Sequence, residues 1–140
     1  GNKPGKTITI NFYGADGVHF VDLPGYGFSK TSKSEKQRFS GMIEGYFSQD
    51  RDIRLVVQLV DMRHEPSDDD IMMMDYLCSR KIPFAVIMTK SDKLNKTDFA
   101  LCEKNINEKV KRYAPVAVTA FSALNGSGTE QIRKIIEQHL

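Results

Sequence analysis

The sequence lacks the features that mark several classes of protein. Its 140 residues contain no apolar run near the ~18 residues that suggest a membrane span. They contain no signal-peptide pattern of basic start, apolar stretch and small-residue cleavage site. No internal repeat or low-complexity segment is present in them either. We therefore expect one globular domain over residues 1–140, with no membrane partner.

Cysteine and net charge are also low. The chain has only two cysteines, Cys78 and Cys102, and their spacing suits no metal site. We expect both to be buried thiols of a reduced, cytoplasmic protein. The formal net charge of +2 indicates no strong general attraction to polyanions. The 40% hydrophobic and 27% charged composition is typical of a globular protein that buries one core.

The first part of the chain predicts a hairpin and a helix. Residues 7–13 alternate apolar and polar side chains, which is the period of a half-buried strand. Asp16-Gly17 is a hairpin turn signal, so residues 18–21 are the expected return strand. Residues 23–27, with a proline and two glycines, cannot continue regular structure. A helix then begins near Ser34, which makes a capping box with Gln37.

Strands and helices alternate in the rest of the chain. Residues 55–60, 83–88 and 116–118 are short apolar runs, and the first of them is nearly continuous, as expected of a strand covered on both faces. Apolar residues at helical spacing lie between and after these runs, and Ser67 is placed to cap the first of these helices. This alternation predicts a three-layer α/β fold with a mostly parallel sheet.

Polar residues follow the ends of the predicted strands. In open α/β sheets, ligands bind beyond the carboxyl ends of the strands. Asp22, Asp61, Asp92 and Ser122 all lie at or near such an end. His64 is close to one of them, and we interpret it as a structural residue beside the sheet rather than as a catalytic base. The ligand site is therefore expected in these loops.

The segment Asp22-Leu23-Pro24-Gly25 suits a magnesium–nucleotide site. A carboxylate at a strand end can hold Mg²⁺ directly or through water, because this ion keeps several waters and takes few protein ligands. Gly25 lets the backbone approach a terminal phosphate closely. Four-residue patterns of this kind also arise by chance, so a capped turn is the alternative.

Thr89-Lys90-Ser91-Asp92 indicates recognition of guanine. An aspartate that faces the guanine edge accepts hydrogen bonds from N1–H and from the exocyclic amine, and adenine offers no such pair of donors. Each charge-assisted bond contributes about 1.5–3 kcal/mol, so the loss of two would discriminate strongly against ATP. The aliphatic stem of Lys90 can lie along the base while its ammonium stays in water. A polar loop with a solvated lysine is the alternative.

Phe121-Ser122-Ala123 completes an ordered series of loop motifs. It follows the next predicted strand, where a backbone N–H could donate to guanine O6. Alone it has little meaning. The order D-x-x-G, T-K-x-D, S-A, with each motif after a strand of one alternating pattern, rarely arises by chance. It favours a guanine-nucleotide site.

Four cations gather within nine residues after the first of these motifs. They are Lys30, Lys33, Lys36 and Arg38. One interpretation is a solvated loop and helix start. The other is a contact with ribosomal RNA, because contacts with phosphates need clustered cations.

These motifs together resemble the TrmE-Era-EngA-EngB-septin-like family of GTPases, and most closely its EngB (YihA/YsxC) type. The resemblance runs from Lys3 to the C-terminus. It is most specific in residues 3–7 (KPGKT), 20–28 (FVDLPGYGF), 60–64 (VDMRH) and 89–92 (TKSD). It implies the three-layer P-loop NTPase fold of Ras-like GTPases, with GTP or GDP and Mg²⁺ as ligands and GTP hydrolysis as the activity.

The resemblance also implies roles for individual positions. Residues 5–9 would form the first switch, in which the Thr7 hydroxyl is a magnesium ligand. Asp22 would be the second ligand, directly or through water, and would open the second switch, which reads the γ-phosphate. The loops after the later strands would enclose the guanine. The implied GTP-binding residues are Gly5, Lys6, Thr7, Ile8, Thr9, Asp22, Leu23, Pro24, Gly25, Thr89, Lys90, Ser91, Asp92, Phe121, Ser122 and Ala123.

The resemblance further implies a cellular role. Proteins of this type act in assembly of the large ribosomal subunit, so the subunit or its RNA is the implied partner. An older association links the family to cell division and septation. We therefore expect a cytoplasmic, monomeric GTP-binding protein.

Two features depart from the family pattern. The family begins with a strand, a G-x-x-x-x-G-K-[S/T] phosphate loop and a helix, whereas residues 1–5 read like the middle of a loop. We therefore expect a fold that lacks these three elements, a sheet in two pieces and weak phosphate binding. Tyr26 stands where Ras-like proteins place a water-orienting glutamine, so we expect slow hydrolysis and assign no catalytic residue. The rival hypothesis is a non-hydrolysing ribosome- or RNA-binding module without the phosphate loop.

Overall fold

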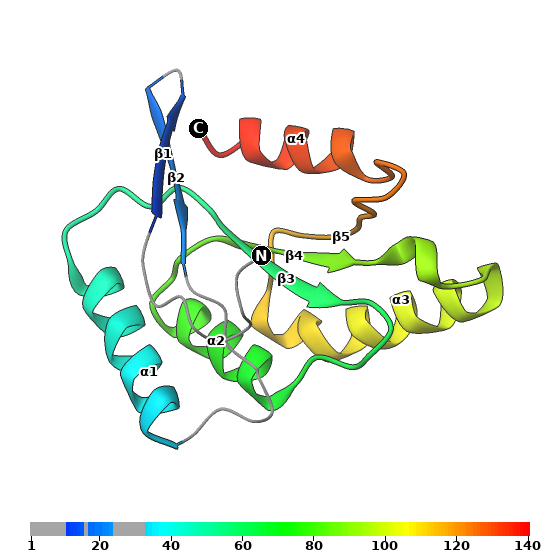
Figure 1. The fold of residues 1–140 in the computed structure, drawn as a ribbon, viewed down its shortest axis with the longest axis horizontal. Helices are drawn as coiled ribbons and strands as arrows, with labels where there is room; N and C mark the ends of the chain where they lie inside the picture. Colours follow the sequence, from blue (N-terminus) through cyan, green and yellow to red (C-terminus); the bar gives the residue numbers. More distant parts are fainter. Residues whose placement is uncertain (1–10, 16, 24–32) are drawn as a thin grey trace. The chain divides into compact units, whose positions relative to one another are not determined.

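The computed structural model describes residues 11–15, 17–23 and 33–140 (Figure 1). The chain divides into two compact units, Gly1–Asp52 and Ile53–Leu140. The described strands form two separate sheets, one of two strands and one of three. A sheet in two pieces was predicted, and for the described strands that prediction is confirmed. The single domain over residues 1–140 stays a prediction.

The first unit contains a β-hairpin. β1 (Asn11–Ala15) pairs antiparallel with β2 (Val18–Asp22), with Asn11 opposite Asp22. Gly17 in the turn has a φ of 78°, which glycine adopts without the steric cost that a Cβ would add. The predicted hairpin is therefore confirmed, and its second strand extends one residue beyond the predicted range, to Asp22.

A helix follows the hairpin in the same unit. α1 (Lys33–Ser48) buries Ile43, Tyr46 and Phe47, which belong to the apolar stripe expected from the sequence. The described part of this helix begins at Lys33, and residues 24–32 lie outside the described residues. The capping box of Ser34 with Gln37 therefore stays a prediction.

The second unit contains a parallel sheet. β3 (Val56–Asp61), β4 (Phe84–Thr89) and β5 (Ala117–Ala120) pair in the order β3-β4-β5. Asp61 lies opposite Thr89, so β3 and β4 end at the same edge of the sheet. Residues 84–88 of the central strand are all buried, which makes it the middle of the core. The predicted parallel sheet of buried strands is confirmed for β4.

Helices lie on both sides of this sheet. Figure 1 shows α2 (Asp68–Ser79) and α3 (Lys96–Val110) on one side and α4 (Thr129–Glu137) on the other, which gives the three layers predicted. Two short 3-10 helices, η1 (Ser91–Lys93) and η2 (Lys111–Tyr113), follow β4 and α3. The buried side chains contributed by α2 and α3 are Met74, Leu77, Ile106 and Val110.

Two expectations about burial are wrong. One face of β3 is buried through Gln58 and Val60, but Leu59 on the other face is 60% exposed. α4 contacts β5, which lies at the opposite edge of this sheet from β3. Cys78 is exposed and Cys102 is half-buried, so neither is the fully buried thiol that the helical spacing suggested.

Candidate functional site

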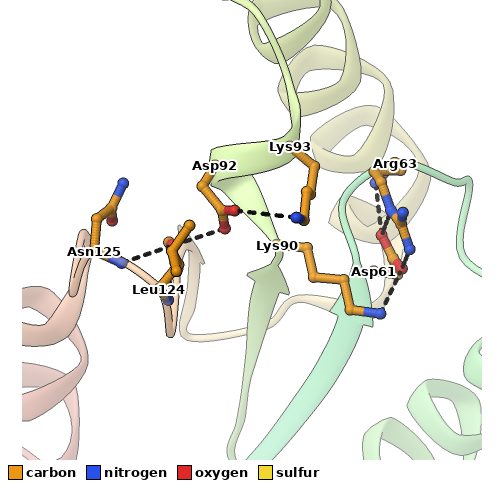
Figure 2. A network of polar contacts seen from close by, with 8 residues as sticks. Asp61, Arg63, Lys90, Asp92, Lys93, Leu124 and Asn125 are labelled. Atoms are coloured by element: carbon orange, nitrogen blue, oxygen red, sulfur yellow. Dashed lines mark hydrogen bonds and ion pairs between the residues drawn. The ribbon is translucent and has the colours of Figure 1, made fainter.

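Three loops meet where the strands of the parallel sheet end (Figure 2). The N–H of Met62 donates to the Thr89 carbonyl at 3.0 Å, which ties the loop after β3 to the end of β4. The N–H of Ser91 donates to the Phe121 carbonyl at 3.1 Å, which ties the loop after β4 to the loop after β5. These backbone hydrogen bonds fix the positions of the loops, and so they also fix the Cα atoms from which the loop side chains extend.

The Ser122 hydroxyl fixes the carboxylate of Asp92. Ser122 is fully buried, and its Oγ donates to Asp92 Oδ1 at 2.7 Å. The same Oγ accepts the backbone N–H groups of Leu124 and Asn125, both at 3.2 Å. The other carboxylate oxygen, Asp92 Oδ2, lies 4.0 Å from Lys93 Nζ. Because each carboxylate oxygen carries two lone pairs, Asp92 is held in place and still has capacity to accept hydrogen bonds.

The loop that carries Ser122 is closed on itself. The Ser122 N–H donates to the Ser127 carbonyl and the Gly126 N–H to the Ser122 carbonyl, both at 2.9 Å. Gly128 has a φ of 92°, and a Cβ there would overlap the carbonyl oxygen of Ala120. Glycine therefore lets α4 begin directly against the end of β5, and this compact closure keeps Ser122 buried.

A second polar cluster joins the ends of β3 and β4. The backbone N–H and Nε of Arg63 each donate to Asp61 Oδ1 at 3.0 Å, and Nη2 donates to Oδ2 at 2.7 Å. Lys90 Nζ lies 3.3 Å from the same Oδ2. The hydrogen bond from the Arg63 side chain is the main reason why the pKa of Asp61 lies well below its usual range. Burial acts in the opposite direction, and the backbone N–H of Arg63 and the ammonium of Lys90 lower the pKa further.

The structure brings part of the predicted site together. The T-K-x-D motif runs from the last residue of β4 into η1, the S-A motif follows the end of β5, and Ser122 contacts Asp92 directly. Asp22 and Leu23 lie at the end of β2 in the other unit. Residues 5–9, Pro24 and Gly25 lie outside the described residues.

Three of the four predicted RNA-contacting cations are described. Lys33, Lys36 and Arg38 are exposed in the first turns of α1. Lys30 lies outside the described residues, as does Tyr26.

The sequence did not reveal the partners of Asp61. It placed Asp61 at a strand end but gave no sign that Arg63 and Lys90 would share its carboxylate. The signal that could have found them is the pairing of β3 with β4, since Asp61 opposite Thr89 makes Lys90 a neighbour.

The donor chemistry for Mg²⁺ is present in part. Within residues 11–15, 17–23 and 33–140, no three His, Cys, Asp or Glu side chains gather where they could hold a metal ion. Mg²⁺ takes few protein ligands and keeps several waters, so one exposed carboxylate such as that of Asp22 fits it. The other predicted ligand, Thr7, lies outside the described residues.

No helix in the described part of the chain is both long and apolar enough to cross a membrane.

Residues 1–90 match the model of a protein family whose description is 50S ribosome-binding GTPase. The chain belongs to this GTPase family. The strands β3 and β4 lie within the part of the chain that this family model matches. Thr89 and Lys90 of the T-K-x-D motif lie inside the matched range, whereas Ser91, Asp92 and the S-A motif lie beyond it.

Solved structures have the same fold as this chain. A probable GTP-binding protein engB has a TM-score of 0.80 at 21% identity, over 96% of this chain and 83% of that one. Elongation factor SelB from Methanococcus maripaludis, in complex with the GTP analogue GppNHp, has a TM-score of 0.68 at 19% identity, over 97% of this chain and 29% of that one. Its apo form has a TM-score of 0.54 at 22% identity, over 60% of this chain and 19% of that one.

These similarities establish the fold. It is the α/β fold of P-loop GTPases, with strands in a parallel sheet and helices around it. The chain spans less than a third of the length of SelB.

Proposed function

We propose that this GTPase-family protein binds GTP and GDP through the loops after β4 and β5, and hydrolyses GTP slowly. The observation that carries the proposal is the hydrogen bond of 2.7 Å from Ser122 Oγ to Asp92 Oδ1. It fixes a charged acceptor at the end of the parallel sheet, where ligands of α/β proteins bind. A carboxylate that is already ordered contributes more to affinity, because less freedom is lost on binding.

Guanine is the base that fits these loops. Asp92 would accept from guanine N1–H and from the exocyclic amine, which adenine cannot match. Within the described loop, the N–H groups of Phe121 and Ser122 are used by the carbonyls of Met88 and Ser127. The N–H of Ala123 is therefore the candidate donor to guanine O6. Lys90, whose side chain is 55% exposed, would lay its aliphatic stem along one face of the base.

Mg²⁺ and the phosphates belong to other parts of the chain. Asp22 and Thr7 would hold the ion, which supplies charge compensation for the phosphates of GTP. Residues 5–9 and 22–25 would approach the γ-phosphate. Tyr26 follows this segment in place of a water-orienting glutamine, so hydrolysis would be slow and the catalytic group is left unassigned.

We also propose a role in assembly of the large ribosomal subunit, in the cytoplasm and as a monomer. The family description, which names the 50S ribosome, supports this role. The exposed cations Lys33, Lys36 and Arg38 of α1 would contact ribosomal RNA. The resemblance to the EngB type also supports proposing a link to cell division and septation.

The Asp92→Asn substitution tests base recognition. Asn keeps an Oδ1 that can still accept from Ser122, but it replaces Oδ2 by an amide that offers a donor to a guanine donor. We expect the affinity for GDP to fall by one to two orders of magnitude, because a charge-assisted bond is worth about 1.5–3 kcal/mol. Affinity for xanthosine diphosphate should rise, since xanthine presents an acceptor there. Competition binding with GDP and xanthosine diphosphate measures both changes in affinity, and it is done with the full-length protein.

A matched substitution separates recognition from charge. Asp98→Asn removes the same charge from the first turn of α3, and it should leave the preference for GDP unchanged. If wild type and Asp92→Asn prefer GDP over xanthosine diphosphate to the same extent, the assignment of the base site is contradicted. Ribosome association without any nucleotide binding or hydrolysis would favour the rival RNA-binding module.

A further inference from the structure

Lys90 does not extend freely into solvent from its loop. Its ammonium lies 3.3 Å from Asp61 Oδ2, although the two residues belong to different strand ends (Figure 2). Lys90 adopts a left-handed backbone conformation, with φ 61° and ψ 34°, directly before η1. Figure 2 shows its side chain running from the β4 loop toward Asp61, while Asp92 lies toward Leu124 and Asn125. The two side chains are therefore held apart by different partners.

The acceptor for Lys90 is itself fixed. Two side-chain nitrogens and the backbone N–H of Arg63 hold the Asp61 carboxylate at 2.7 to 3.0 Å. The loop that carries Arg63 is anchored in turn, because the N–H of His64 donates to the Asp61 carbonyl at 3.1 Å. A carboxylate in such a clamp cannot follow a moving lysine. It defines one place at which the lysine ammonium is favoured.

The ion pair alone would be a weak restraint. The Lys90 side chain is 55% exposed, and exposed pairs between flexible side chains add little to stability. Its effect on a ligand is different, because ordering a long side chain costs conformational entropy when the ligand arrives. A lysine that is ordered beforehand has less freedom to lose. The benefit would therefore be seen in binding more than in folding.

We propose that Asp61 and Arg63 are positioning residues for the nucleotide site, and that they act by holding Lys90 across the ends of β3 and β4. The inference rests on the proposed guanine-nucleotide function of this site. Arg63 fixes Asp61, Asp61 fixes the ammonium of Lys90, and the aliphatic stem of Lys90 is thereby kept as one wall of the base site. Asp92, held by Ser122, reads the base edge from the other side.

A double-mutant cycle tests this chain of contacts. Asp61→Asn should weaken GDP binding about three- to tenfold, which corresponds to the cost of ordering one long side chain on binding. Lys90→Met keeps an apolar stem without the ammonium, so in that background Asp61→Asn should change the affinity by less than about twofold. Arg63→Gln should weaken GDP binding in the same direction but less, and this effect should also vanish with Lys90→Met.

Controls separate positioning from general charge and from unfolding. Glu65→Gln breaks the Glu65–Lys109 pair of 3.6 Å in the same loop region, and it should leave GDP binding unchanged. Thermal unfolding identifies any variant that fails to fold. If Asp61→Asn does not fold, Arg63→Gln takes its place in the double-mutant cycle. NMR relaxation of the Lys90 ammonium and Cε groups, without nucleotide, should show greater mobility in Asp61→Asn than in wild type.

The outcomes distinguish the two proposals. Non-additive losses together with a more mobile Lys90 support the positioning role. Equal losses from Asp61→Asn with and without Lys90→Met, or an unchanged Lys90 mobility, overturn it while leaving the proposed function intact. No GDP binding by the wild-type protein overturns the proposed function and the inference that rests on it.

Discussion

Asp61 is a residue through which pH acts on this fold. The hydrogen bond from the Arg63 guanidinium is the largest cause of its lowered pKa, and burial works in the opposite direction. In the unfolded chain the same carboxyl titrates near 3.9, as aspartate does in peptides, so roughly from pH 5 downward the unfolded state binds more protons than the folded state. A lowered folded pKa therefore stabilises the fold above the unfolded pKa, and this stabilisation is lost as the pH falls.

The pH dependence of stability gives a direct measurement. We expect the free-energy difference between wild type and Asp61→Asn, from urea unfolding, to be constant above about pH 5 and to shrink toward pH 3. A difference for Asp61→Asn that does not change between pH 7 and 3 would mean that the clamp does not exist in solution.

Ala114 offers a second test at the scale of one residue. It ends η2 in the left-handed region, with φ 52° and ψ 52°, and it is exposed. A Cβ in this region costs about 1–2 kcal/mol, whereas glycine at such a site costs about 0.4–1 kcal/mol through the unfolded chain. Ala114→Gly should therefore stabilise the protein by up to about 1 kcal/mol, measured by chemical unfolding. Destabilisation would show that the strain is relieved in solution.

At the scale of elements, α2 shows how a sequence signal becomes a helix end. Ser67 Oγ accepts from the Asp70 N–H at 3.1 Å, and Asp70 Oδ2 accepts from the Ser67 N–H at 2.9 Å. This reciprocal pair satisfies two backbone donors that the helix itself cannot use. Three aspartates in the first turn add a favourable interaction with the helix dipole. The cap thus sets where the loop after β3 ends.

Removing the cap should cost stability without changing the site. Ser67→Ala leaves a helix donor without its protein partner, and we expect a loss of about 1 kcal/mol in the free energy of unfolding. Ser79→Ala is the matched control, because that hydroxyl only donates to the Tyr76 carbonyl at the other end of α2. It should change stability by less than about 0.5 kcal/mol. Equal effects of the two variants would argue against the capping box.

The elements were more predictable than the contacts between them. The apolar run of residues 83–88 and the cap at Ser67 depend on neighbours in sequence, and both were predicted. The exposed face at Leu59 was not predicted. An apolar run indicates that a strand can be buried, but it does not indicate whether a helix covers each of its faces. The Asp61–Lys90 contact was also missed, since it joins residues 29 positions apart and follows only from the register of β3 with β4.

At the scale of the whole molecule, the proposed base site and the proposed RNA contact belong to different units. Asp92, Ser122 and Lys90, which would bind the base, belong to the unit Ile53–Leu140. The exposed cations that would contact ribosomal RNA belong to α1, in the unit Gly1–Asp52. A change in α1 should therefore alter ribosome association without altering nucleotide affinity. A substitution in the basic turns of α1 can test that independence.

Neutralising Lys33, Lys36 and Arg38 together, each to glutamine, should weaken association with large ribosomal subunits. Each lost phosphate contact removes about 0.7–0.9 from the slope of log affinity against log salt, so three lost contacts should flatten it by about 2 to 3. Sedimentation with purified large subunits at several salt concentrations gives the slope, and GDP titration should show unchanged affinity. The control neutralises Lys96, Lys104 and Lys111, which are exposed cations of the other unit. If both triple variants flatten the slope equally, the effect comes from net charge and α1 is not the RNA contact.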